Sequence, residues 1–469
     1  MNRVVIIGGG PGGYEAAHVA AQQGADVVVV DSDGIGGSAV LTDCVPSKTL
    51  IAAAEVMSDV ARAIDLGITY HDDDTASLSH MQVDLARINA RVKTLAGEQS
   101  SYITDNLERD GVRVVRGRGR LDGAGRVVVT LNEGGTETLE APTVLVATGA
   151  APRTLPTAQP DGERILTWEQ VYDLDEAPES LVVVGSGVTG AEFASAYLAL
   201  GIPVTLVSSR DRVLPGEDAD ASAVLEEVAR RRGMTVLSKS RMQSVVRDGE
   251  RVTVTLTDGR TVSASHCILA LGSIPKTSDL GLEEAGVVLD DGGFIKVDRV
   301  SRTSARGIYA AGDCTGVLML ASVAAMQGRI AMWHHFGDAV TPLDLKKVSS
   351  NVFTSPEIAT VGVTQQAVDA GKVEAEVVML PLAGNARAKM QGVQDGFVKL
   401  FCRPGTGVVI GGVVVGPKAS ELIHPLAVAV SESLTADSMA KVFTVYPSMS
   451  GSLAEAARRL HHVDDDKFF

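Results

Sequence analysis

The sequence predicts an α/β protein built from two similar parallel-sheet units in one chain. Three observations lead to this prediction: a length of 469 residues, a content of 49 glycines, and two glycine-rich turns that each follow a short apolar run. A chain this long exceeds one ordinary hydrophobic core, so two to four domains are expected. Many of the glycines lie in short turns, which indicates repeated close approach of the backbone to another group.

The first unit lies at the N-terminus. Residues 4–7 are apolar and β-branched, which is typical of a buried parallel strand. They lead into a GxGxxG pattern that begins at Gly8, a helical stretch at residues 14–23, and a second strand at residues 27–30 that ends at Asp31. Strand, turn, helix, strand and acid in this order predict a Rossmann-like dinucleotide-binding unit.

Each residue of this pattern has a physical role. Gly8 permits the tight turn, Gly10 lets the backbone approach a pyrophosphate, and Gly13 lets the helix and the strand pack closely. The N-terminus of the helix adds free N–H groups and the positive end of a dipole. Asp31 can accept hydrogen bonds from a ribose hydroxyl group. We therefore expect a dinucleotide at this turn.

The same order of elements recurs in the middle of the chain. Residues 181–184 and 204–207 are predicted strands, and residues 191–200 are the helix between them. The second pattern contains Gly185, Gly187 and Gly190. Two such patterns indicate two dinucleotides, one held permanently and one exchanged; a duplication with one inactive copy is the alternative.

The second unit lacks the acid. Ser208 stands in its place, followed by Ser209 and Arg210. Loss of the carboxylate removes its repulsion towards a 2′-phosphate, and a nearby arginine can pair with that phosphate, which favours NADPH. The alternative is that Arg210 is simply solvated and that the protein uses both NADH and NADPH.

Three further segments read as antiparallel strands, and two as C-terminal helices. Residues 126–131, 136–140 and 252–256 are the expected strands of small antiparallel sheets, and residues 425–433 and 450–460 the expected helices.

Charge and composition argue against several classes of protein. The net charge of −16 is spread along the chain, which argues against nucleic acid or anionic lipid as a main partner. No apolar run reaches the roughly 18 residues of a membrane span, and the apolar run at the N-terminus is too short for a signal peptide. We therefore expect a cytoplasmic protein. The four cysteines form no CxxC pair, and with the histidines they show no metal-ligand spacing.

Several motifs resemble those of the pyridine nucleotide–disulfide oxidoreductase family, which includes dihydrolipoamide dehydrogenase and glutathione reductase. They comprise residues 36–38 with 44–48, 147–149, 307–313 and 352–362. The resemblance implies two Rossmann-like domains, for FAD and NAD(P), and a C-terminal α+β dimerisation domain. The implied boundaries are 1–150 with 275–345 for FAD, 151–274 for NAD(P) and 346–469 for dimerisation, in a homodimer.

The resemblance also implies the residues of the site. For FAD they are Gly8, Gly10, Pro11, Gly12, Gly13, Asp31, Gly37, Ser38, Cys44, Lys48, Gly119, Thr148, Gly149, Asp313 and Ala321. For the nicotinamide dinucleotide they are Gly185, Gly187, Gly190, Ser208, Ser209, Arg210 and Gly272. Lys48 and Glu192 match a pair beside the flavin, where the ammonium can stabilise negative charge. The alternative is that Glu192 merely starts a helix and faces solvent.

The disulfide chemistry of the family is missing. Its members carry two cysteines five positions apart. Here one position is Cys44, but the partner position is Ala39, which cannot hold a thiolate. The family's histidine and glutamate near the C-terminus are replaced by Tyr446 and Gly451, so the acid that protonates a leaving thiolate is also lost. Cys44 is then either a small buried residue or a thiol that tunes the flavin.

We therefore expect an NAD(P)H:quinone oxidoreductase, in which Lys48, Glu192 and Tyr446 serve the reaction and a flat quinone accepts the electrons. The combination resembles actinobacterial quinone reductases that look like lipoamide dehydrogenases without the redox pair. One alternative is a soluble transhydrogenase that passes hydride from NADPH to NAD⁺. A lipoamide dehydrogenase would need a thiol at Ala39. A non-catalytic flavoprotein subunit would not need two intact glycine patterns.

Overall fold

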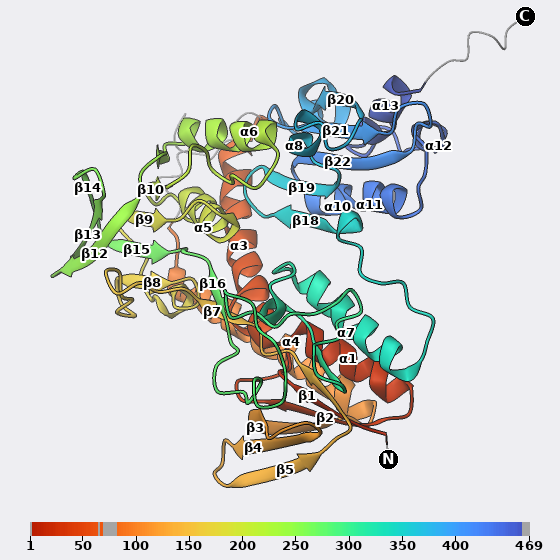
Figure 1. Ribbon diagram of the computed structural model, residues 1–469. Helices are drawn as coiled ribbons and strands as arrows, with labels where there is room; N and C mark the ends of the chain where they lie inside the picture. The colour runs from red at the N-terminus through yellow and green to blue at the C-terminus, as the bar shows by residue number, and fades with distance from the viewer. Residues whose placement is uncertain (1, 64–65, 69–81, 462–469) are drawn as a thin grey trace, which may run out of the picture.

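The computed structural model describes residues 2–63, 66–68 and 82–461. Figure 1 shows three bodies: one around the N-terminal strands, one around β9 and α5, and one formed by the C-terminal segment. The long helix α3 (Cys44–Ala63) runs from the first body up between the other two. None of the described helices is long and apolar enough to cross a membrane.

The first body is a seven-stranded sheet in the order β17-β6-β1-β2-β3-β4-β5. Its strands are β1 (Arg3–Ile7), β2 (Asp26–Asp31), β3 (Arg113–Leu121), β4 (Arg126–Leu131), β5 (Thr136–Glu140), β6 (Thr143–Val146) and β17 (Ile308–Ala310). Its helical segments are α1 (Pro11–Gln22), α2 (Gly37–Leu41), α4 (Leu85–Arg109), η4 (Asp313–Thr315) and α7 (Ala321–Phe336). The apolar β1 and β2 pair in parallel at the centre, so both faces of the sheet are buried.

The second body repeats this plan on a smaller scale. A five-stranded sheet has the order β11-β10-β9-β15-β8, and a three-stranded antiparallel sheet has the order β12-β13-β14. The strands are β8 (Ile165–Thr167), β9 (Leu181–Val184), β10 (Val204–Val207), β11 (Thr235–Leu237), β12 (Met242–Asp248), β13 (Arg251–Leu256), β14 (Thr261–Ala264) and β15 (His266–Leu269). The helices are η3 (Val171–Asp173), α5 (Val188–Ala199) and α6 (Ala219–Arg231). Two short strands, β7 (Ala150–Pro152) and β16 (Ser273–Pro275), pair where the chain leaves the first body and returns to it.

The third body is an antiparallel sheet in the order β18-β19-β22-β21-β20. Its strands are β18 (Ser349–Val352), β19 (Glu357–Gly362), β20 (Glu376–Pro381), β21 (Phe397–Cys402) and β22 (Val409–Gly416). Its helices are η5 (Leu345–Lys347), α8 (Gln365–Asp369), η6 (Leu382–Gly384), α9 (Ala386–Met390), α10 (Ala419–Leu422), α11 (His424–Ser431), α12 (Ala436–Ala440) and α13 (Gly451–Arg459).

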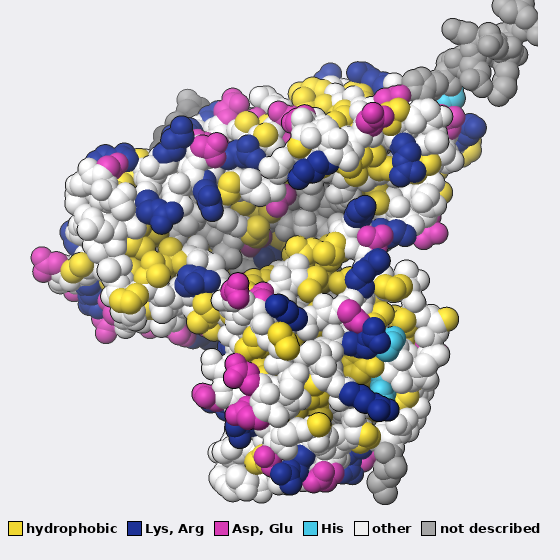
Figure 2. Space-filling model, viewed as in Figure 1, with side chains coloured by type: hydrophobic (Ala, Val, Ile, Leu, Met, Phe, Trp, Pro, Cys, Tyr) yellow, Lys and Arg dark blue, Asp and Glu magenta, His cyan; other side chains and the backbone are white. Residues whose placement is uncertain are grey.

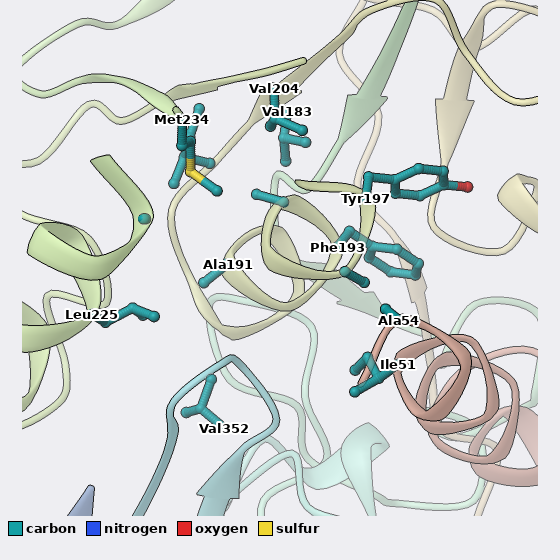
Figure 3. Close-up of a cluster of buried hydrophobic side chains, with 14 of the residues drawn as sticks. Ile51, Ala54, Val183, Ala191, Phe193, Tyr197, Val204, Leu225, Met234 and Val352 are labelled. Atoms are coloured by element: carbon teal, nitrogen blue, oxygen red, sulfur yellow. The ribbon is translucent and has the colours of Figure 1, made fainter. Parts of the chain in front are cut away.

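One apolar cluster joins the three bodies. Phe193 of α5 points towards Ile51 and Ala54 of α3, Tyr197 of α5 belongs to the same cluster, and Val352 of β18 lies below α5 (Figure 3). This packing holds α5 against α3 and brings the end of β18 beside α5. Residues from three separate stretches of sequence therefore meet beside the first turns of α3.

The predicted elements are present with small shifts. Helices α1 and α5 begin three residues earlier than expected, because the last residues of each glycine pattern already form the first helical turn. Residues 126–131 and 136–140 are strands, but they do not form a separate small sheet. β3 pairs in parallel with β2 and antiparallel with β4, so β4 and β5 extend the main sheet.

The surface carries charges of both signs. On the face drawn in Figure 2, basic and acidic side chains are interspersed over all three bodies, with hydrophobic side chains in small groups between them. The part of this face that is described thus presents no continuous basic surface of the kind that binds a phosphate backbone.

Candidate active site

The first glycine turn has the geometry that a pyrophosphate requires. Gly8 has φ +107°, and a Cβ there would lie 2.2 Å from the carbonyl oxygen of Ala147. A Cβ on Gly13 would lie 1.9 Å from the carbonyl oxygen of Gly8. A Cβ on Gly10, by contrast, would meet its nearest heavy atom at 3.9 Å. Gly8 and Gly13 are thus required by packing, while Gly10 borders open space where a ligand can approach the backbone.

The second glycine turn repeats these relations. Gly185 has φ +112°, and its Cβ would lie 2.1 Å from the carbonyl oxygen of Ala270. A Cβ on Gly190 would lie 1.9 Å from the carbonyl oxygen of Gly185, whereas a Cβ on Gly187 would meet nothing within 4 Å. Both turns therefore combine two glycines held by packing with a middle glycine that faces open space.

A cavity extends from the first turn to the start of α3. The predicted residues that line it are Gly8, Gly10, Pro11, Gly12, Asp31, Gly37, Ser38, Cys44, Thr148, Gly149, Asp313 and Ala321. An adjoining recess shares Gly8 and Asp31 with it and is lined by the predicted Gly119. Gly13 lies beneath the turn, and Lys48 follows Cys44 by about one turn of α3. The open face of Gly10 and the cavity's extent from β2 to α3 fit an extended dinucleotide such as FAD.

The two turns differ at the end of the second strand. Asp31 accepts hydrogen bonds from the backbone N–H groups of Gly9 (2.6 Å) and of Asp33 and Gly34 (both 2.8 Å). Ser208 is fully buried, its hydroxyl group 2.7 Å from that of Ser186, and it accepts a hydrogen bond from the N–H of Arg210 at 3.1 Å. The Ser208 side chain, which is smaller than that of aspartate, thus stabilises the loop that follows β10.

The positions beside Ser208 are open. Ser209 and Arg210 are exposed, and no hydrogen bond or ion pair of the Arg210 guanidinium occurs among the described residues. The carbonyl oxygen of Arg210 accepts a hydrogen bond from the N–H of Lys239 at 2.7 Å, which places a second basic residue beside this loop. Gly272 has φ +88°, and its carbonyl oxygen accepts a hydrogen bond from the backbone N–H of Arg153.

Lys48 and Glu192 form an ion pair at the point where the three bodies meet. The Lys48 ammonium lies 2.8 Å from Oε2 of Glu192, and the backbone N–H of Phe353 donates to Oε1 at 2.8 Å. Glu192 is only 4% exposed, so it does not face solvent. Lys48 also lies 4.9 Å from the centre of the Phe353 ring. Burial alone would lower the pKa of Lys48, but the Glu192 carboxylate raises it, so the ammonium stays charged.

Cys44 has no partner thiol. Ala39 lies beside it in the cavity wall, and all four cysteines are free. Burial, followed by the Asp43 carboxylate, raises the pKa of the Cys44 thiol to about 12. At neutral pH the residue is therefore a thiol rather than the thiolate that attacks disulfides.

Tyr446 lies outside this cavity. Its side chain is 85% exposed, and the neighbouring Phe443 is fully exposed. Within one chain the structure thus brings Lys48 and Glu192 together but leaves Tyr446 apart from them. Gly451 begins α13, and Glu455 binds Arg458.

Comparisons with known proteins agree with this geometry. The sequence model of the family described as pyridine nucleotide-disulphide oxidoreductase matches residues 2–328, and the model of its dimerisation domain matches residues 348–457. The chain belongs to the pyridine nucleotide-disulphide oxidoreductase family. As a member of this family it is a flavoenzyme that uses FAD and a pyridine nucleotide.

One member of this family is much more similar in sequence to this chain than the dihydrolipoyl dehydrogenases are. A protein of Mycobacterium tuberculosis named NAD(P)H dehydrogenase (quinone) is 57% identical over 99% of this chain and 95% of its own length. A dihydrolipoyl dehydrogenase of Zymomonas mobilis is 34% identical over 97% of this chain and 96% of its own length. The crystal structure of LpdA from Mycobacterium tuberculosis superimposes with a TM-score of 0.93 at 56% identity, covering 98% of this chain and all of that chain.

Sequence reasoning missed three parts of this family site. Phe353 holds Glu192 through its backbone N–H, Lys276 and Met319 line the cavity, and Asp43 lines it together with Ala39 and Cys44. The contacts of Phe353 depend on packing between distant segments and leave no sequence signal. Asp43 did have a signal, because it stands next to Cys44 in the motif.

Proposed function

We propose that this protein transfers hydride from NAD(P)H to FAD and then passes the electrons to a quinone. The observation that carries the proposal is the cavity wall at Ala39 and Cys44, where the second thiol is absent, although the ion pair of Lys48 and Glu192 that begins one turn further along α3 is intact. A family member with this site can accept hydride but cannot pass it through a disulfide. The similarity to a protein named NAD(P)H dehydrogenase (quinone) supports the same acceptor.

The residues of the site divide the work in this proposal. The residues around Gly10 and Asp31 hold FAD, which when bound supplies the two-electron chemistry, and those around Gly187 hold the nicotinamide dinucleotide. Lys48 provides positive charge where electron density arrives, and Glu192 and Phe353 hold it in place. Ser209 and Arg210 are exposed just after β10, and we propose that they bind the 2′-phosphate and that NADPH is accepted.

We also propose three domains and a homodimer. The boundaries are 1–150 with 275–345, 151–274 and 346–469. The grouping of strands into sheets supports them, because β17 returns to the sheet of β1 after the second body is complete. The dimerisation-domain match and the exposed Phe443 and Tyr446 support the homodimer, in which Tyr446 would reach the partner's site. We place the protein in the cytoplasm, where NADH and NADPH are supplied by metabolism.

An anaerobic experiment tests the proposed function. The purified flavoprotein is reduced with one equivalent of NADPH, and menadione, lipoamide or NAD⁺ is then added in separate samples. We expect rapid return of the yellow colour with menadione and none with lipoamide. Rapid return with NAD⁺ and not with menadione would establish the transhydrogenase alternative. Failure of NADPH to bleach the flavin would support a non-catalytic protein instead.

A further inference from the structure

Asp43 is a carboxylic acid fixed in the wall of the FAD cavity. It precedes α3 and lines the cavity together with Ala39 and Cys44. Its backbone N–H donates to the carbonyl oxygen of Ser38 at 2.7 Å, and its carbonyl oxygen accepts from the N–H of Ser47 at 2.7 Å. Its carboxyl group makes no hydrogen bond or ion pair to any described residue. The backbone therefore holds an unpaired carboxyl group in the cavity wall.

The surroundings of Asp43 contain more acids than bases. Lys48 is the cation that lowers the pKa of Asp43, and this ammonium is already bound to Glu192 at 2.8 Å; Lys276 lines the same cavity. The other titratable groups that influence or are influenced by Asp43 are Cys44 on α3, Glu169 before η3, Tyr172 on η3 and Asp313 on η4. Glu169 accepts a hydrogen bond from Thr42 at 3.2 Å, whereas the buried Tyr172 hydroxyl group has no partner among the described residues.

This arrangement favours a neutral acid at position 43. Burial raises the pKa of Asp43; Lys48 opposes that rise, and the carboxylates of Glu192 and Glu169 add to it. Burial and Asp43 together raise the pKa of Asp313 to about 6. Several carboxyl groups that share one ammonium cannot all ionise at low cost, so one of them keeps its proton to a higher pH than a free aspartic acid would.

Reduction of a quinone needs such a proton. The overall reaction is NAD(P)H + quinone + H⁺ → NAD(P)⁺ + quinol, in which the nicotinamide supplies two electrons and one proton as hydride. The second proton has to come from an acid. A positioned acid accelerates such a transfer by typically 10²–10⁴-fold.

We propose that Asp43 is the general acid that protonates the quinone bound beside Ala39. In this step the O–H bond of the Asp43 carboxyl group breaks and an O–H bond of the quinol forms, while the electron pair of the broken bond stays on the carboxylate. Solvent then returns a proton to the Asp43 carboxylate. This inference rests on the proposed quinone reductase function.

The test compares two acceptors. Ferricyanide takes electrons and no proton, whereas menadione takes both. In stopped-flow experiments on NADPH-reduced holoenzyme, Asp43→Asn should slow reoxidation by menadione about 100-fold and leave reoxidation by ferricyanide and the preceding reduction by NADPH unchanged. Asp43→Glu should recover part of the menadione rate. Glu55→Gln removes an acid of α3 that pairs with Lys418 at the surface, and it should change none of these rates.

A second readout is independent of turnover. Infrared difference spectra of the protein, with and without FAD, should show a carboxylic acid band that titrates above the range of an ordinary aspartic acid, is absent from Asp43→Asn and remains in Glu55→Gln. In wild-type enzyme, the menadione rate should fall as pH rises through this titration, and Asp43→Asn should show no such fall.

Three outcomes would overturn the proposal in different ways. Equal slowing with menadione and ferricyanide, or a lower flavin content, would make Asp43 a flavin-binding group. An unchanged menadione rate in Asp43→Asn would remove Asp43 from the reaction while leaving the quinone function intact. A wild-type enzyme that reduces ferricyanide but no quinone would refute the proposed function itself.

Discussion

At residue 44, a family position known for thiolate chemistry carries a half-buried neutral thiol. Burial and the neighbouring Asp43 raise the pKa of Cys44 to about 12, so the thiol is protonated at neutral pH. The same acid that we propose as a proton donor thus also suppresses the thiolate.

This leads to a spectroscopic prediction. From neutral pH up to about pH 10, below the raised pKa, we expect no long-wavelength thiolate–flavin band and slow alkylation of Cys44 by iodoacetamide. The absorption spectrum of reduced and oxidised enzyme across this range checks the prediction. A band that develops near neutral pH would mean that Cys44 ionises and that the burial argument is wrong.

Arg210 provides a prediction about cosubstrate choice. Arg210→Ala should raise the KM for NADPH about 10- to 100-fold, since a hydrogen bond to a charged group contributes about 1.5–3 kcal/mol, and should leave the KM for NADH unchanged. Steady-state kinetics with both cosubstrates measure the change. Arg251, which binds Ser263 in the small antiparallel sheet, is the matched control for loss of one arginine. An equal effect on both cosubstrates would refute a role in binding the 2′-phosphate.

At the scale of elements, the two glycine patterns were readable because their interactions are local. Each pattern relates residues within five positions of one another, as in the contact between Gly13 and Gly8. Helix starts were less readable, because residues 11–13 can belong to a turn or to a helix until the strand beneath them is placed. The pairing of β3 with both β2 and β4 likewise depends on the sheet around it.

A buried ion pair joins two elements of different bodies. Lys399 of β21 lies 2.8 Å from Asp218, the N-cap of α6, and 2.7 Å from Asp220. Lys399 and Asp218 are almost fully buried. This pair anchors the helix of the second body to the sheet of the third.

Breaking this pair should destabilise the protein strongly. Lys399→Ala leaves Asp218 buried without its cation, which typically costs about 3–5 kcal/mol. Urea unfolding followed by circular dichroism measures the loss, and Lys372→Ala, an exposed lysine of the same body, is the control. A loss as small as that of the control would show that water or a rearranged side chain compensates Asp218.

At the scale of the whole molecule, the segment around Phe443 is unusual for a surface. Val442, Phe443, Val445 and Tyr446 lie close together in the sequence, and all four side chains are exposed. Adjacent exposed hydrophobic side chains of this kind mark a protein interface. The segment belongs to the region that matches the family's dimerisation domain.

We therefore expect Phe443→Asp to weaken the homodimer. A charge introduced into an apolar contact has to be desolvated, so the dimer dissociation constant should rise by 10-fold or more, since each 1.4 kcal/mol is a factor of ten. Sedimentation velocity over a range of protein concentrations measures it. Val246→Asp, at an exposed site of β12, is the control. A dimer that survives Phe443→Asp unchanged would place the interface elsewhere.

The sequence by itself determined the two nucleotide-binding turns, the membership of the family and the loss of the disulfide relay. These properties depend on residue types at short spacings, such as Gly8 to Gly13 or Ala39 to Cys44. Only the tertiary structure decided that the N–H of Phe353 holds Glu192, that Lys399 binds Asp218, and that Asp43 lies among other acids in the cavity wall. Such contacts join residues more than a hundred positions apart, and the charge state of a group depends on the burial that this packing creates.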